Sequence, residues 1–153
     1  MDNSEATFEE TGGGSTIAKL PLLAAIVALC GLADAIYLVI HHYTFELPPC
    51  VEGFDCAAVL TSPYATFGGI PIAIFGSIAY FTAFSLAILT VFGNRLTWRL
   101  FGIQVILMAL FTSWLVYLQA FVIKAFCQYC MISAGTTFTL LIIALASKFW
   151  RSR

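Results

Sequence analysis

Charged residues are scarce in this sequence. Only 10% of its 153 residues are Asp, Glu, Lys or Arg, whereas 61% are hydrophobic, and the mean hydropathy is +0.95. These values lie outside the range of ordinary soluble domains. With seven Lys and Arg in the whole chain, nucleic acid is not an expected partner.

The sequence is rich in long apolar runs. A membrane-spanning helix needs about 20 largely apolar residues, and four stretches qualify: residues 20–40, 70–92, 100–123 and 125–146. We therefore predict an all-α membrane protein, a bundle of four transmembrane helices formed by residues 17–149. Residues 1–16 are polar, acidic and glycine-rich, which predicts a flexible tail, and residues 150–153 form a second short tail. No basic segment precedes a short apolar run, so we do not expect a removable signal peptide.

The basic residues predict the orientation of the bundle, because Lys and Arg that flank the spans resist translocation. If both termini are cytoplasmic, the outer side holds only Lys124. The inner side then holds Lys19, Arg95, Arg99, Lys148, Arg151 and Arg153. Residues 41–69, which contain no Lys or Arg, are expected to form a long outer loop of a plasma-membrane protein.

Four of the five cysteines fall on the predicted outer side, where disulfides persist. Cys50 and Cys56 lie in the outer loop, and Gly53 between them makes a turn that would bring them within bonding distance plausible. Cys127 and Cys130 form a CxxC motif at the start of the fourth span, where the helix N-terminus favours a thiolate on one of them. Cys30, in the middle of the first span, is interpreted as a small buried hydrophobe.

Other interpretations of the four outer cysteines remain open. Four thiolates can hold zinc, although the spacing of Cys50 and Cys56 is wide for such a site, and we predict no metal. A set of purely structural disulfides would make the chain a non-catalytic module with four spans and a stapled loop. A small transporter is disfavoured because the sequence shows no repeated, interrupted spans.

Asp34 is the one carboxylate within a predicted span, and an intramembrane ionisable residue is a candidate for function. It shares a helical face with Cys30 and Tyr37. We hypothesise that Asp34 supports proton transfer or polarises a thiol; the alternative is a structural polar contact between helices. His41 and His42 point to different faces of the helix and are interpreted as interfacial residues.

The cysteine motifs resemble those of the vitamin K epoxide reductase (VKOR) family, as found in microbes. The matching segments are CVEGFDC in the loop, TSPYATFGGIPIAIFG after it and VIKAFCQYC before the last span, and the likeness covers roughly residues 20–146. It implies a four-helix bundle around a quinone, with the outer loop, in part a half-helix, covering the quinone site. The implied function is similar to that of the bacterial disulfide-forming membrane protein DsbB: a quinone-dependent thiol oxidase for exported proteins, with a thioredoxin-fold (DsbA-like) partner on the outer side.

The resemblance also assigns roles to individual residues. Cys127 and Cys130 correspond to the active-site CxxC, and Cys50 and Cys56 to the pair that relays electrons to it. Ser62 matches the family's serine after the loop cysteines and is expected beside the quinone. Ile72 and Ala134 are expected at the same site, in positions where animal enzymes carry Asn and Tyr, which leaves epoxide reduction, the alternative activity, without its usual oxygen-binding groups. Two further candidates come from the residues themselves: Asp34, and Phe75, whose ring could flank the quinone or pack in the core.

Overall fold

The structure, a computed structural model, describes residues 6–152 and contains four helices that are long and apolar enough to cross a membrane. These are α1 (Ala6–Thr44), α3 (Ile72–Val91), α4 (Arg95–Tyr117) and α5 (Gln128–Ser152); a π-helical turn, η1 (Leu118–Ile123), continues α4. The loop between α1 and α3 contains the short helix α2 (Cys56–Leu60) and a hairpin of β1 (Thr66–Phe67) and β2 (Ile70–Pro71). The predicted all-α membrane bundle is therefore confirmed, with the hairpin as its only strands in the described part of the chain.

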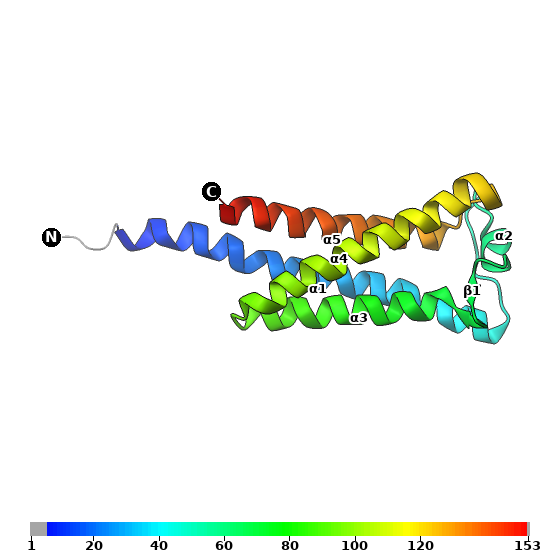
Figure 1. Cartoon of the computed structure of the whole chain (residues 1–153), viewed down its shortest axis with the longest axis horizontal. Coiled ribbons are helices and arrows are strands. Elements are labelled where there is room, and N and C mark those ends of the chain that lie inside the picture. Colours follow the sequence, from blue (N-terminus) through cyan, green and yellow to red (C-terminus); the bar gives the residue numbers. More distant parts are fainter. Residues whose placement is uncertain (1–5, 153) are drawn as a thin grey trace.

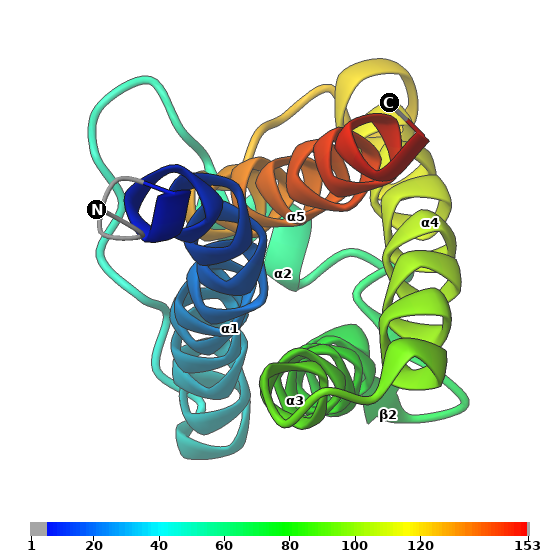
Figure 2. The same cartoon turned by 90° about the vertical axis from the view of Figure 1, so that its left-hand side faces the viewer.

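The four long helices run side by side, with α2 and the hairpin gathered at one end and both chain ends at the other (Figure 1). Viewed end-on, they stand at the corners of a square in the order α1, α3, α4, α5 (Figure 2). Each helix contacts its two neighbours in this ring. A bundle in this order has an interior that all four helices line.

The span boundaries agree with the predicted ones to within a few residues, except that α1 and α5 extend further. Residues 6–16, expected to be a flexible tail, continue α1 as helix. Propagation from the helix nucleated in the apolar run thus outweighs the low helix propensity of the three glycines at positions 12–14. The remainder of that tail, residues 1–5, lies outside the described residues. Similarly, α5 continues to Ser152 through most of the predicted second tail.

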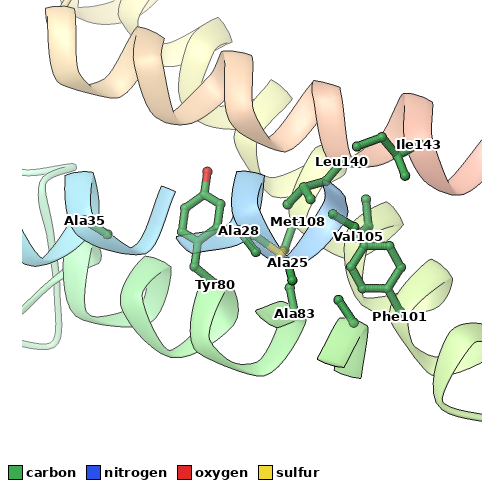
Figure 3. Close-up of a cluster of buried hydrophobic side chains, with 12 residues drawn as sticks. Ala25, Ala28, Ala35, Tyr80, Ala83, Phe101, Val105, Met108, Leu140 and Ile143 are labelled. Carbon is green, nitrogen blue, oxygen red and sulfur yellow. The ribbon is translucent and has the colours of Figure 1, made fainter. Parts of the chain in front are cut away.

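The half of the bundle near the termini is close-packed around small side chains. Ala24, Ala25 and Ala28 of α1 face Ala83 and Ala87 of α3, and all five are at most 2% exposed. Small residues let helix backbones approach closely, which favours association in lipid. Larger side chains of α4 and α5 close this core, among them Phe101, Val105, Leu140 and Ile143 (Figure 3).

The basic residues divide between the two ends of the bundle as their sequence positions require. Arg95 opens α4 and Lys148 lies near the end of α5, both at the end that carries the termini. Lys124 follows η1 at the opposite end, next to the loop, with a left-handed backbone (φ 57°). The loop end thus carries little positive charge.

Candidate redox site at the loop end of the bundle

Cys50 and Cys56 form a disulfide, with their Cα atoms 6.2 Å apart. The chain reverses between them at Gly53, whose φ of 97° suits glycine, and the Phe54 N–H donates to the Val51 carbonyl at 3.1 Å. Cys50 is half-buried, whereas Cys56, the first residue of α2, is only 2% exposed. Cys50 is therefore the more accessible sulfur of the bridge.

Cys127 and Cys130 are both free thiols at the start of α5. The Cys127 carbonyl accepts the Met131 N–H at 3.0 Å, which makes Cys127 the residue that caps the helix. Cys127 is completely buried and packs with Cys56 and Val59 in one hydrophobic cluster, against which Cys50 and Cys130 also pack. The structure thus brings together all four cysteines that the sequence singled out.

The helix start acts on the Cys127 thiol. A hydrogen bond with the Cys130 side chain is the main cause that lowers the pKa of Cys127 from 9.0 to about 7. The backbone N–H groups of Tyr129 and Cys130 lower this pKa further, whereas burial and the charge of Asp34 raise it. Cys127 is therefore the cysteine of the pair that is poised as a thiolate near neutral pH.

Gln119, a buried residue that sequence reasoning missed, holds the segment before Cys127 in place. Its side-chain oxygen accepts the Cys127 N–H at 3.0 Å, and its carbonyl accepts the Ala125 N–H at 3.1 Å. The widened π-helical turn places Gln119 on the inside of the bundle, 3% exposed. A glutamine within an apolar run could have been identified as a polar group that needs a buried partner.

The loop between α1 and α3 is docked on the start of α5 by three hydrogen bonds. The Asp55 N–H donates to the Phe126 carbonyl at 2.9 Å, the Val51 N–H to the Gln128 side-chain oxygen at 3.1 Å, and the Tyr129 hydroxyl to the Pro49 carbonyl at 2.9 Å. We call these three bonds the docking contacts. They join the residues next to Cys50 and Cys56 to the residues around Cys127.

Beneath the loop, the bundle encloses a cavity of about 750 Å³. Of the residues expected at a quinone site, Asp34, Ser62, Ile72 and Phe75 line this cavity, and so does Cys130. Ala134 is buried but does not line it, whereas Ser133 and Thr137 do. The assignment of Ala134 is therefore replaced by its neighbours, because the cavity-facing positions of α5 follow Cys130 at spacings of three and seven.

Asp34 lies in the cavity wall, and its Oδ2 atom is buried without a hydrogen-bond partner in the described part of the chain. Its charge acts on Cys127, so it lies near the CxxC motif as hypothesised.

Cys30, one turn before Asp34, is exposed on the outside of α1 and not buried as expected. His42 lines the rim of the cavity, a position that its interpretation as an interfacial residue did not include.

Tyr80 forms the floor of the cavity and was also missed. Its side chain rises from α3 with the hydroxyl directed toward α5 (Figure 3), where the hydroxyl lies 2.7 to 2.9 Å from four oxygen atoms. These atoms are the carbonyl and hydroxyl oxygens of Ser133 and the hydroxyl oxygens of Thr136 and Thr137. The ring packs against Gly31 of α1, where a side chain would overlap it.

Among the described residues, no group of three or more His, Cys, Asp or Glu is placed to hold a metal ion. Two of the four cysteines at the loop end of the bundle are already joined in a bridge. The zinc interpretation therefore has no support in this geometry.

The chain matches the model of the vitamin K epoxide reductase family over residues 22–145, most of its length. It belongs to the VKOR family. VKOR-family proteins are membrane oxidoreductases that use quinones. The bridge, the CxxC motif and the cavity that adjoins it are consistent with this membership.

Proposed function

We propose that this VKOR-family protein is a thiol oxidase that makes disulfides for exported proteins. In this proposal a thioredoxin-fold (DsbA-like) protein delivers two electrons to the Cys50–Cys56 bridge, Cys127 and Cys130 receive them, and a quinone in the cavity is the final acceptor. The carrying observation is the burial of Cys56 against Cys127, between an accessible Cys50 and a Cys130 that lines the cavity. The four sulfur atoms form a path from the loop surface to the cavity.

The first exchange begins with the bridge oxidised, as the structure has it. A thiolate of the partner attacks the accessible sulfur of Cys50, the Cys50–Cys56 bond breaks, and Cys56 leaves as a thiolate. The second thiol of the partner then resolves the mixed disulfide and restores the Cys50 thiol. The partner has lost two electrons, and the loop pair has gained them.

The second exchange occurs when Cys127 and Cys130 are joined in a disulfide. The Cys56 thiolate attacks Cys127 and releases Cys130, and Cys50 then attacks Cys56, which restores the bridge and releases Cys127. Its lowered pKa makes Cys127 a good leaving group. Oxidation of this dithiol by a quinone yields the quinol and restores the Cys127–Cys130 disulfide, so electrons balance over the cycle.

The cavity has the size and lining that a quinone head group requires. Its 750 Å³ lies within the range of small-molecule sites, and its walls are mostly apolar with a few polar groups. Phe75, Leu107, Phe111 and Trp114 line the cavity and are also at least 43% exposed. These residues of α3 and α4 therefore open the cavity toward lipid, where an apolar quinone tail can remain.

Reduction of a quinone also requires two protons. If Cys127 has lost its proton before it reacts, the dithiol supplies only one of them. Asp34 lies in the cavity wall near both thiols and has a buried oxygen without a partner. We propose that Asp34 transfers the remaining proton to the quinone oxygen.

The orientation of the protein in the membrane follows from its basic residues. We propose that the end with Lys19, Arg95, Arg99 and Lys148 is cytoplasmic. The loop then faces the outside of a microbial plasma membrane, which is the compartment in which a disulfide-forming enzyme acts. The partner would reach Cys50 from water.

Substitution of Cys56 by serine separates the two halves of the proposed cycle. Cys56→Ser leaves Cys127 and Cys130 able to reduce a quinone when a small dithiol reduces them, but removes transfer from a dithiol protein. The measurement is anaerobic quinol formation with dithiothreitol or with reduced thioredoxin as the donor. Wild-type rates with thioredoxin in the Cys56→Ser protein would refute the relay, and the exposed Cys30→Ser substitution is the matched control.

A further inference from the structure

Two of the docking contacts come from the residues between the cysteines of the CxxC motif. Gln128 accepts the N–H of Val51 and Tyr129 donates to the carbonyl of Pro49, so they bind the residues on either side of Cys50. The third contact joins Asp55, which precedes Cys56, to Phe126, which precedes Cys127. Both cysteines of the bridge are therefore held by their neighbours against the start of α5.

We propose that Gln128 and Tyr129 are positioning residues that dock the outer loop so that Cys56 lies against Cys127 for thiol–disulfide exchange. This role in exchange rests on the relay proposed above. The dipeptide inside a CxxC motif then has a role besides spacing the two sulfurs: it recognises the segment that carries the other redox pair.

The surroundings of Tyr129 extend the anchoring to α1. Its ring lies 5.1 Å from the ring of Tyr37, and the Tyr37 ring lies 4.4 Å from that of His41. The His41 Nδ1 atom lies 3.0 Å from the Glu46 carbonyl, at the start of the loop. A row of three rings thus connects both ends of the segment before Cys50 to the bundle.

Exchange between two buried sulfur pairs depends strongly on such positioning. The attacking sulfur must meet the bond that it breaks in a defined geometry, and tethered groups gain rate in proportion to the time that they spend in that geometry. The segment between α1 and α2 is otherwise an irregular loop, residues 45–55. Loss of one hydrogen bond is expected to reduce the docked population, and with it the exchange rate, about three- to tenfold.

The test measures the exchange directly in the Cys130→Ser background, without quinone or partner. There the Cys127 thiolate attacks Cys56, the Cys50–Cys56 bond breaks, and Cys50 leaves as a thiolate that takes a proton from water. The solubilised full chain is moved from pH 5 to pH 8 and quenched with N-ethylmaleimide at intervals, and mass spectrometry quantifies the Cys56–Cys127 disulfide. Gln128→Leu and Tyr129→Phe are each expected to slow its formation about three- to tenfold.

Two further variants separate positioning from a general loss of structure. Gln128→Glu keeps an acceptor oxygen for the Val51 N–H and, when compared at an equal fraction of Cys127 thiolate taken from its own pH profile, should retain a rate within about twofold of the parent. Tyr43→Phe removes a hydroxyl from an exposed tyrosine of the same end of α1, whose ring contacts His42, and should also leave the rate unchanged. Thermal unfolding of each variant is the control, and all of them are expected to be as stable as the parent.

Equal exchange rates in the Leu, Phe and parent proteins would overturn the inference, and so would a Gln128→Glu protein as slow as Gln128→Leu. If the parent Cys130→Ser protein forms no Cys56–Cys127 disulfide, both the docking role and the relay are wrong. Failure of quinone reduction alone would remove the proposed acceptor and leave the docking result standing.

Discussion

The two halves of the bundle use the same four helices for different purposes. Near the termini, alanines of α1 and α3 and larger side chains of α4 and α5 fill the interior, and the side chains at its centre are fully buried. Near the loop, the helices enclose the cavity, the redox cysteines and the polar atoms of Asp34 and Gln119. Packing that stabilises the bundle and side chains suited to chemistry are therefore separated along the helix axes, with Tyr80 at the boundary.

The largest effect on stability is expected in the packed half. Phe101 is completely buried and stacks on Trp98 with ring centroids 4.7 Å apart. Phe101→Ala should therefore lower the free energy of unfolding by about 3 kcal/mol, as measured by denaturation in detergent, while quinone reduction per folded molecule is unchanged. Phe92→Ala, at a side chain 82% exposed, is the control, and equal losses in both variants would remove the distinction between the halves.

A loss of activity without a loss of stability is expected at Asp34, in the half of the bundle that contains the cavity. Asp34→Asn keeps the shape of the side chain but cannot transfer a proton as a carboxyl group does, so quinone reduction should slow at least tenfold. The Cys56–Cys127 exchange should not slow, because removal of the Asp34 charge favours the Cys127 thiolate, and the stability of the bundle should be unchanged. Normal quinone turnover in this variant would return Asp34 to a structural role.

The reaction rate at the loop end of the bundle should depend on pH through the Cys127 thiol. Because the pKa of Cys127 is lowered to about 7, the reactive thiolate forms as the pH rises through 7 and is lost below it. The rate at which reduced Cys127 attacks a small disulfide should rise about tenfold between pH 6 and pH 8. Cys130→Ala removes the main hydrogen bond and should move the midpoint upward; an unmoved midpoint would contradict the assigned cause.

The smallest effect is expected where the two halves meet. Ser133 lies one turn after Cys130, and its hydroxyl, 2.9 Å from that of Tyr80, borders the cavity. Ser133→Ala removes the hydrogen bond between the Ser133 and Tyr80 hydroxyls at the cavity wall. The loss of this one bond should raise the KM for quinone about threefold, with little change in stability. Ser147→Ala removes the acceptor of the Trp98 ring N–H in the packed half, and an equal change in KM there would show that both serines act only through helix packing.

The sequence predicted the packed architecture better than the interior of the site. The four spans follow from apolar runs whose length is set by the thickness of the membrane, and the structure confirms them. Two features of the site were also predictable from local sequence. The approach of Cys50 to Cys56 depends on the turn at Gly53, and the place of CxxC at a helix start depends on where the last apolar run begins.

The partners of single polar residues were not predictable in the same way. Gln119, Gln128 and Tyr80 each make contacts with residues that are distant or on another element, and an apolar run gives no pattern that identifies such partners. The misplacement of Ala134 has a related cause. An error of one residue along a helix turns a position by about 100°, which is enough to exchange a cavity-facing serine for an alanine that faces a neighbouring helix.

The packed half of the bundle has a consequence for the movement of protons through the protein. Among the described residues, the membrane-spanning stretches of the four helices between Tyr80 and the terminal end contain no Asp, Glu or His. The buried hydroxyl of Thr97 is bonded to that of Thr90 at the start of α4, so the described interior offers no continuous route for protons to the cavity. In the relay proposed above, electrons enter through the loop, and the protons that accompany them would come from the same face. Turnover would then displace no charge across the bilayer, and its rate should be indifferent to the membrane voltage.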